Sequence, residues 1–252
     1  MADRIVLEVK QLDLRIGGAH IINDVSFSVP QGELLGVIGP NGAGKTTLFN
    51  LISGVLRPTG GSVHLEGADV SSAPISTRAR SGLGRTFQTS SLFPGLSVRE
   101  NVRLAAQVKG GNSLSVIRFP KASDAANTIA AARLEDVGLT HLAEQTASGL
   151  SHGDKRKLEI AMLLAQDPAV LLLDEPMAGV ASGDVPGLVA LIRSLHRDQG
   201  RTVLMVEHHM DVVLGLVDRV AVMHHGQVLA IGSPADVMAN ADVQSAYLGD
   251  PL

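Results

Sequence analysis

The first third of the chain alternates between apolar and polar residues and then changes to a continuous apolar run. Residues 5–16 (IVLEVKQLDLRI) and 21–29 (IINDVSFSV) alternate as half-buried strands do. Residues 33–39 (ELLGVIG) follow a turn and form a short apolar run that ends in glycine, which is typical of a strand buried on both faces. Residues 44–56 have a helical pattern, and residues 57–70 predict a turn and a strand. The order is therefore antiparallel strands followed by a strand–loop–helix unit.

The pattern changes between residues 91 and 150, where helical periodicity replaces strand alternation. Residues 97–109 (SVRENVRLAAQVK) and 121–139 (KASDAANTIAAARLEDVGL) predict helices, and residues 110–120 between them contain the glycine and serine typical of a loop. This stretch indicates a helical insert.

Strand patterns return after the insert, with helices between them. The expected strands lie in AVLLLDEP (169–176), TVLMVEH (202–208), RVAVMHHG (219–226) and QVLAIG (227–232). No internal repeat or long linker divides the chain. We therefore predict one α/β domain over residues 1–252, with an α-helical subdomain inserted at about 91–160.

Composition restricts the class of protein. The 252 residues contain no cysteine, which excludes disulfides and thiolate metal sites, and 45% of them are hydrophobic. The net charge of −4 and an aromatic content of 2% argue against nucleic-acid binding. The first ten residues do not resemble a signal peptide, and no apolar run approaches the roughly 20 residues that span a bilayer. Any role at a membrane would then require a partner.

One glycine-rich stretch, GPNGAGKTT, fits the phosphate-binding pattern G-x-x-x-x-G-K-[ST] between an expected strand and an expected helix. Glycines let successive backbone N–H groups surround a phosphate, and the helix N-terminus adds partial positive charge. The lysine can reach the β- and γ-phosphates, and the first threonine hydroxyl can bind Mg²⁺. A glycine-rich turn without a ligand is the alternative. The candidate residues are Gly39, Pro40, Asn41, Gly42, Ala43, Gly44, Lys45, Thr46 and Thr47.

Two acidic residues end the apolar run at 169–176. Asp174 and Glu175 would emerge at the carboxyl end of a buried strand, where α/β sheets bind ligands. Asp174 could hold Mg²⁺ and Glu175 could polarise a water molecule. The alternative is a strand that ends in an acidic turn.

The segment LSHGD (150–154) predicts the start of a helix. Ser151 can cap the helix, with Asp154 three residues later. The basic residues 155–157 that follow are expected on a solvated helix face. The histidine pairs 208–209 and 224–225 show no recognisable metal-ligand spacing.

With these motifs in place, the chain resembles the ATP-binding cassette (ABC) ATPases over essentially its whole length. The resemblance implies a P-loop NTPase (RecA-like) core with an antiparallel β subdomain, and ATP and Mg²⁺ as ligands. It further implies head-to-tail dimers in which the signature, usually LSGGQ, faces the ATP of the other subunit. Here Ser151 and Gly153 match the signature, whereas His152 and Asp154 depart from it.

The resemblance also assigns individual residues. Gln88 matches the Q-loop, which contacts Mg²⁺ and the membrane partner, and His208 matches the switch histidine at the γ-phosphate. Ile16 stands where the family often has an aromatic residue against adenine, and Ala181 where it usually has Asp or Asn. Lys45, Gln88, Glu175 and His208 are thus the expected catalytic residues; Thr46, Gln88 and Asp174 are the expected metal ligands.

Within the family, the chain is most similar to ATPase subunits of bacterial branched-chain amino-acid importers. The stretches that carry this similarity are GLGRTFQTSSLFPGLSVRENV, LDEPMAGV, VEHHMDVVLGLVDRVAVMHHGQVLAIGSP and VQSAYLGDPL. Urea or amide importers and lipopolysaccharide exporters remain alternatives. A non-transport ABC ATPase would usually carry coiled coils, zinc cysteines or a second cassette, and this chain has none of these.

This similarity implies a second ATPase subunit, identical or paralogous, two membrane permease subunits and, indirectly, a periplasmic binding protein. It places the chain at the cytoplasmic face of the bacterial inner membrane. Phe87, Leu92 and Phe93 flank Gln88 and are expected to contact a permease helix. Burial of the same residues inside the helical insert is the alternative.

Overall fold

The structure is a computed structural model that describes residues 4–86, 92–109, 125–208 and 210–248. The chain divides into two compact units. The first comprises Met1–Arg85, Ala169–Pro176 and Arg193–Leu252, and the second comprises Thr86–Pro168 and Met177–Ile192. The range 91–160 expected for the helical insert falls within the second unit, which is wider and includes a later segment.

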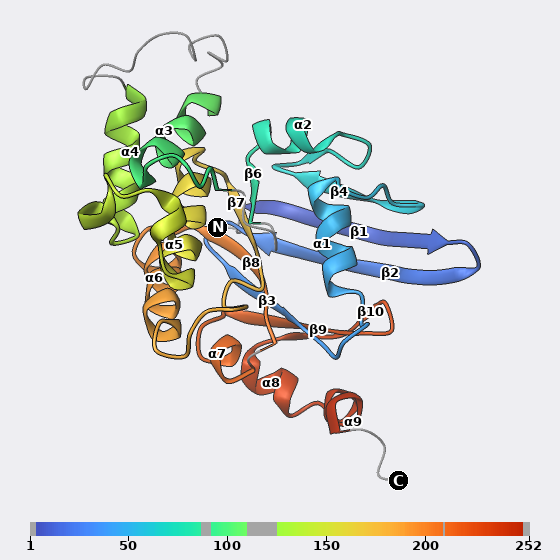
Figure 1. The fold of residues 1–252 in the computed structure, drawn as a ribbon. Coiled ribbons are helices and arrows are strands. Elements are labelled where there is room, and N and C mark those ends of the chain that lie inside the picture. The colour runs from blue at the N-terminus through green and yellow to red at the C-terminus, as the bar shows by residue number, and fades with distance from the viewer. Residues whose placement is uncertain (1–3, 87–91, 110–124, 209, 249–252) are drawn as a thin grey trace. The chain divides into compact units, whose positions relative to one another are not determined.

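The first unit contains a four-stranded and a six-stranded sheet among its described residues (Figure 1). The smaller sheet is antiparallel, in the order β2-β1-β4-β5. Its strands are β1 (Ile5–Ile16), β2 (Ala19–Pro30), β4 (Gly60–Leu65) and β5 (Ala68–Asp69).

The larger sheet has the order β10-β9-β3-β8-β7-β6, with β10 antiparallel to β9 and the other neighbours parallel. Its strands are β3 (Leu34–Ile38), β6 (Leu83–Arg85), β7 (Val170–Asp174), β8 (Thr202–Val206), β9 (Arg219–His224) and β10 (Gln227–Gly232). Every residue of β3, β7 and β8 is buried, as their continuous apolar runs predict.

Helix α1 (Lys45–Ser53) joins the two sheets into one core. Its Leu48, Phe49, Leu51 and Ile52 belong to a single buried cluster with residues of both sheets. The helix ends at Gly54, whose φ of 82° is a left-handed conformation that glycine adopts without steric cost. The apolar face of α1 is therefore held from both sides within the first unit. The first unit also contains α2 (Ile75–Arg80), α7 (Met210–Leu214), α8 (Pro234–Met238) and α9 (Ala241–Leu248).

The described part of the second unit is helical. Helices α3 (Val98–Lys109), α4 (Ala125–Asp136) and α5 (His152–Ala165) pack against one another. Two short 3-10 turns, η2 (Thr140–Leu142) and η3 (Ala147–Gly149), connect α4 to α5. Helix α6 (Val185–Arg197) begins in the second unit and ends in the first.

The helix expected over residues 121–139 ends earlier than its sequence pattern indicated. Gly138 adopts a φ of 73°, and its N–H bonds the carbonyl of Glu135, while the N–H of Leu139 bonds the carbonyl of Leu134. This is a Schellman termination, and Leu134 and Leu139, at the two positions where that motif commonly has apolar residues, are both buried. The apolar residues 137–139 belong to the cap rather than to the helix.

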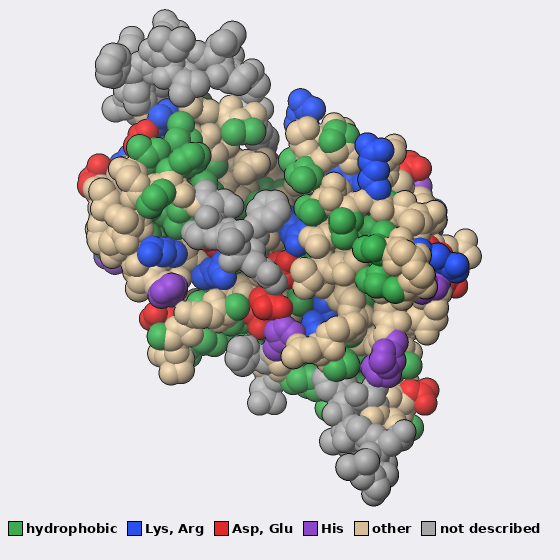
Figure 2. All heavy atoms as spheres, turned by 45° about the vertical axis from the view of Figure 1, so that its right-hand side comes forward, with side chains coloured by type: hydrophobic (Ala, Val, Ile, Leu, Met, Phe, Trp, Pro, Cys, Tyr) green, Lys and Arg blue, Asp and Glu red, His purple; other side chains and the backbone are tan. Residues whose placement is uncertain are grey.

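On the face drawn in Figure 2, hydrophobic side chains lie in small patches among polar and charged ones. Within the described part of the chain, no helix has the length and apolar content that crossing a membrane requires.

The C-terminal end of α1 depends on a buried arginine. Arg78 is 1% exposed, and its Nη1 donates to the carbonyls of Leu51 (2.6 Å) and Ile52 (2.7 Å). Its other nitrogens donate to the carbonyls of Ser71 (2.8 Å) and Ala73 (3.1 Å). Burial lowers the pKa of the guanidinium, an effect that the charge of Asp69 opposes. The hydrogen bonds satisfy carbonyls that a helix end leaves without partners.

We predict that Arg78→Met lowers the free energy of unfolding by about 3 kcal/mol or more, because it removes four hydrogen bonds that the buried guanidinium donates to carbonyls. Urea unfolding of the purified chain measures the change. Arg80→Met is the matched control, since Arg80 is exposed on the same helix and should change stability by under about 0.5 kcal/mol. Equal effects of the two substitutions would contradict this role of Arg78.

Candidate active site

The loop between β3 and α1 needs glycine at three positions. Gly39, Gly42 and Gly44 adopt φ values of 155°, 80° and 102°. A Cβ atom on Gly39 would lie 2.2 Å from the carbonyl oxygen of Met223, so the close approach to β9 also requires glycine. The loop therefore reverses the chain in a conformation that larger residues would not adopt.

The N-terminus of α1 is suited to an anion. Gly44 is the N-cap, no side chain caps the helix, and its first turn contains no acidic residue. The free N–H groups and the helix dipole thus favour a phosphate here. The loop and the helix start have the backbone conformation that a phosphate-binding loop requires, and phosphate binding by residues 39–47 stays a prediction.

Lys45 is folded over this loop and is only 5% exposed. Its Nζ donates to the carbonyls of Gly39 (2.6 Å) and Pro40 (2.9 Å). Burial lowers the pKa of the ammonium group, and the negative charge of Glu175 opposes that shift. The lysine charge is thus held at the loop by backbone dipoles.

Three parallel neighbours of the large sheet bring the other predicted residues to the same edge. Strands β3, β8 and β7 are adjacent and parallel, so their carboxyl ends lie together. The glycine loop leaves β3, Asp174 ends β7 and Glu175 follows it, and His208 follows β8. Helix α1 also packs against β7.

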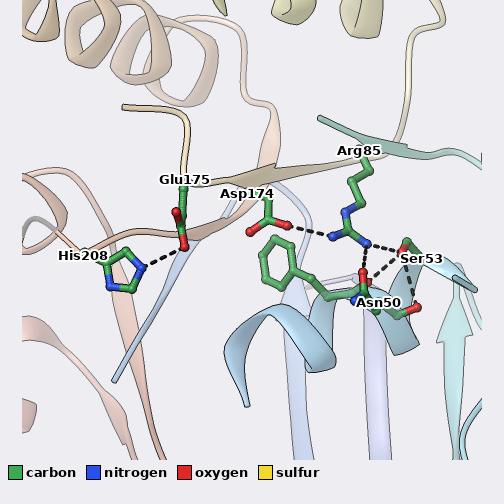
Figure 3. A network of polar contacts seen from close by, with 7 residues as sticks. Asn50, Ser53, Arg85, Asp174, Glu175 and His208 are labelled. Carbon is green, nitrogen blue, oxygen red and sulfur yellow. Dashed lines mark hydrogen bonds and ion pairs between the residues drawn. The ribbon is translucent and has the colours of Figure 1, made fainter. Parts of the chain in front are cut away.

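Glu175 has a strained backbone and a defined partner. Its φ of 48° is uncommon for a residue with a Cβ, and its N–H bonds the carbonyl of Val206 on β8 at 2.9 Å. Its Oε1 lies 2.8 Å from Nε2 of His208, the contact drawn in Figure 3. The structure thus joins two residues that the sequence placed 33 positions apart.

Asp174 is 1% exposed and is bonded to an arginine. Nη2 of Arg85, the last residue of β6, donates to Oδ2 of Asp174 at 2.7 Å. Burial raises the pKa of the Asp174 carboxyl, and the hydrogen bond and charge of Arg85 lower it. Asp174 therefore keeps a charged partner although it is removed from water.

Arg85 continues the network to α1. Its Nη1 donates to Oδ1 of Asn50 (2.8 Å) and to Oγ of Ser53 (2.6 Å), as Figure 3 shows. Its guanidinium carbon lies 5.9 Å from the centre of the Phe49 ring. Arg85 was given no role by the sequence analysis. A usable signal was present, because Arg85 is a charged residue three positions before the predicted site residue Gln88.

Ile16, at the end of β1, is 57% exposed, so an apolar side chain is available at the surface there. Gln88, Phe87 and His209 lie outside the described residues.

His224, the last residue of β9, contacts His225 in the following turn, with ring centroids 4.1 Å apart. In the described part of the chain they join no group of three or more potential metal ligands. The turn has another role, because the N–H of Gly226 bonds the carbonyl of Ala43 at 3.0 Å and so supports the glycine loop.

The segment at Ser151 is a helix cap, as predicted. Oγ of Ser151 accepts the N–H of Asp154 at 3.1 Å and donates to the Asp154 carboxylate at 2.9 Å. Lys157 and Arg156 pair with Asp154 and Glu159 on the same helix. Gly153 is buried, and a Cβ there would lie 2.9 Å from Cβ of Asp184. Close packing within the second unit therefore explains why glycine occupies the first turn.

Comparison with known proteins agrees with this geometry. The family model described as "ABC transporter" matches residues 22–178, and the model described as "Branched-chain amino acid ATP-binding cassette transporter" matches residues 227–251. The high-affinity branched-chain amino acid transport ATP-binding protein LivG of Salmonella typhimurium is 40% identical over 97% of this chain and 98% of its own length. The corresponding protein BraF of Pseudomonas aeruginosa is 39% identical over 98% and 99%. Among solved structures, the ADP conformation of MJ1267, an ATP-binding cassette of an ABC transporter, has a TM-score of 0.85 at 32% identity and covers 98% of this chain and 99% of its own.

We predict that Arg85→Met lowers the free energy of unfolding by about 3–5 kcal/mol at pH 8, because it leaves a buried carboxylate without its cation. Burial already raises the pKa of Asp174. Ionisation of this carboxyl therefore lowers the free energy of unfolding as the pH rises through the pKa of the folded state. Loss of Arg85 raises the pKa further, and acidification should relieve the cost by protonating Asp174. Urea unfolding at pH 5 and pH 8 measures the difference.

Two controls belong with this measurement. Arg85→Met in an Asp174→Asn background should cost less than in the native chain, because no buried charge is stranded. Arg4→Met breaks the exposed ion pair with Glu66 and should cost under about 1 kcal/mol at either pH. A cost of Arg85→Met that is independent of both pH and Asp174 would contradict the prediction.

Proposed function

The chain belongs to the ABC transporter family, as one of its ATP-binding proteins, and from this premise we propose that it powers import of branched-chain amino acids. The observation that supports the cargo class is the match of the C-terminal model to residues 227–251, together with relatives of that activity over nearly the full length. Those residues begin with β10 and include α8 and α9.

The chemistry is hydrolysis of ATP, in which water attacks the γ-phosphorus and the bond to the β-phosphate oxygen breaks. The loop of residues 39–47 binds the phosphates through backbone N–H groups, and Lys45 supplies a positive charge. Turning Nζ of Lys45 from the carbonyls of Gly39 and Pro40 toward a phosphate exchanges neutral acceptors for a charged one.

Mg²⁺ fits the donor set of this site. Thr46 is the second residue of α1 and Asp174 ends β7, two elements that pack together, and both residues offer the oxygen ligands that Mg²⁺ binds. We assign the ion to Thr46 and Asp174, with Gln88 as a further ligand. When bound, Mg²⁺ neutralises charge on the phosphates.

Glu175 and His208 act on the attacking water in this proposal. Glu175 accepts a proton from the water, and the bond to His208 fixes the rotation of its carboxylate. The exposed edge of His208, whose side chain is 42% exposed, is available to the γ-phosphate. Ile16 supplies an apolar contact for the adenine ring.

We propose that the working form is a head-to-tail dimer with an identical or paralogous ATPase. The N-terminus of α5, with Ser151 and Gly153, then faces the ATP of the partner subunit. Two permease subunits anchor the pair at the cytoplasmic face of the bacterial inner membrane, and a periplasmic binding protein delivers the cargo. No nucleic acid takes part.

The permease contact lies in the segment around Phe93, which is 51% exposed. Buried Asn101 holds this segment, accepting the N–H of Phe93 at 2.8 Å and donating to its carbonyl at 3.1 Å. An exposed aromatic ring on a backbone that is fixed by hydrogen bonds is a suitable contact site for an apolar helix. Leu92 is only partly buried and adds apolar surface beside it.

Cargo is tested by co-expressing the chain with the products of its neighbouring genes, purifying the complex that forms and reconstituting it in vesicles. Leucine, isoleucine and valine should stimulate ATP hydrolysis and accumulate in the vesicles. Stimulation by urea or short amides instead would overturn the cargo assignment while leaving the ATPase assignment intact.

We predict that Glu175→Gln lowers the turnover of ATP by about 10²–10⁴-fold and leaves ATP affinity near its native value, because the substitution removes a base and keeps the shape. Lys45→Ala should lower turnover by about 10²–10³-fold and weaken binding as well. Steady-state hydrolysis and equilibrium ATP binding separate the two effects. Loss of affinity in Glu175→Gln would assign that carboxylate to the metal or to the fold.

A mixing experiment tests the shared site. Ser151→Arg should prevent the signature segment at the start of α5 from contacting the ATP of the partner subunit, and Lys45→Ala should disable the phosphate loop. A homodimer of either variant should therefore be nearly inactive. In a mixed dimer, the intact loop of the Ser151→Arg chain meets the intact signature of the Lys45→Ala chain. Activity should therefore recover in part when the two proteins are combined.

Ser151→Ala is the companion variant. Loss of the cap alone costs about 1 kcal/mol of stability, whereas loss of a phosphate contact lowers turnover far more than stability. If Ser151→Ala hydrolyses ATP at the native rate, and this rate per chain does not depend on protein concentration, the segment has no role beyond capping α5.

A further inference from the structure

Arg85 occupies a particular place in the chain. It ends β6 and is the last residue of the first unit before the chain enters the second. Asp174 ends β7, and the chain leaves the first unit again after Pro176. The bond between Arg85 and Asp174 therefore joins the two strand ends from which the second unit departs.

The guanidinium of Arg85 makes contacts that few other side chains could combine. One nitrogen binds the Asp174 carboxylate, and another binds Asn50 and Ser53 on the last two turns of α1. The Arg85 side chain is 7% exposed and that of Asp174 is fully buried, so these bonds form in a site with little water. A planar fork of donors holds the carboxylate in a fixed orientation, which a single ammonium group would not do.

We propose that Arg85 is a positioning residue for the magnesium half of the site: it fixes the Asp174 carboxylate against α1, the helix that begins with Lys45 and Thr46. This inference rests on the proposed function, in which Thr46 and Asp174 hold Mg²⁺. Groups that hydrogen-bond a metal-binding carboxylate orient it, and their loss typically weakens metal binding about 10- to 100-fold.

A purely stabilising role accounts less well for the network. An ion pair this deeply buried is often no more stabilising than apolar residues of similar volume. Arg85 is a cation beside a residue assigned to bind another cation, which disfavours the metal by simple charge repulsion. Orientation of the carboxylate is the benefit that offsets this repulsion.

The test is the magnesium dependence of nucleotide binding by the full chain. A fluorescent, non-hydrolysable ATP analogue is titrated in EDTA and in increasing Mg²⁺. In the native chain Mg²⁺ should tighten binding, and Asp174→Asn should abolish that effect. Arg85→Met and Arg85→Lys should raise the Mg²⁺ concentration for half-maximal tightening by about 10- to 100-fold, with affinity in EDTA nearly unchanged.

Two variants separate positioning from folding. Arg85→Met in the Asp174→Asn background should have no further effect on Mg²⁺ dependence. Arg219→Met is the stability control. Arg219 begins β9 and pairs with buried Glu33, and this ion pair lies away from the carboxyl ends of the strands that carry the site. It should lower stability without changing the Mg²⁺ requirement. If Arg85→Met fails to fold, the double variant Asn50→Leu/Ser53→Ala takes its place. It removes the hydrogen bonds between Arg85 and α1 and should also raise the Mg²⁺ requirement.

The outcomes are distinct. An unchanged Mg²⁺ requirement in the Arg85 variants, or an equal loss of affinity with and without Mg²⁺, overturns the positioning role. A native chain without Mg²⁺-dependent tightening, or an Asp174→Asn variant that retains it, overturns the proposed magnesium site itself.

Discussion

A carboxylate removed from water at the end of a buried strand needs a cation, and Arg85 supplies it to Asp174. The same guanidinium bonds α1, so one side chain joins the strand that carries the acidic residues to the helix that starts at the phosphate loop. The other features of the site depend on this arrangement of strand and helix. Lys45 and Thr46 lie at one end of α1, and the other end is held by Arg78 and Arg85.

The parallel sheet explains why residues far apart in the sequence lie at one edge of the structure. Strands β3, β8 and β7 are buried throughout and run in one direction, so the segments after them emerge at a common edge. The left-handed glycines after β3 turn the chain directly into α1, and the left-handed Glu175 after β7 carries its carboxylate to His208. The strain at Glu175 is tolerated because β8 binds its N–H.

Much of this arrangement could be predicted from the sequence, because it depends on local patterns. The alternation of β1 and β2, the apolar runs of β3, β7 and β8, the phosphate-loop spacing and the Ser151 cap all depend on neighbouring residues. Helix ends were less predictable: Gly54 and Gly138 end α1 and α4 before the apolar pattern stops, because the residues that follow pack as caps. Arg78, Arg85 and the bond from Gly226 to Ala43 escaped prediction, since their partners are set by tertiary packing.

We propose above that the phosphate loop and the end of β7 form one magnesium–nucleotide site. A crystal structure of the chain with Mg²⁺ and a non-hydrolysable ATP analogue tests it most directly. We predict phosphates on the backbone of residues 39–47, the metal ion on the Thr46 hydroxyl and on Asp174 directly or through water, and Asp174 still bonded to Arg85. Phosphates bound elsewhere, or a metal ion that contacts neither Thr46 nor Asp174, would contradict the account.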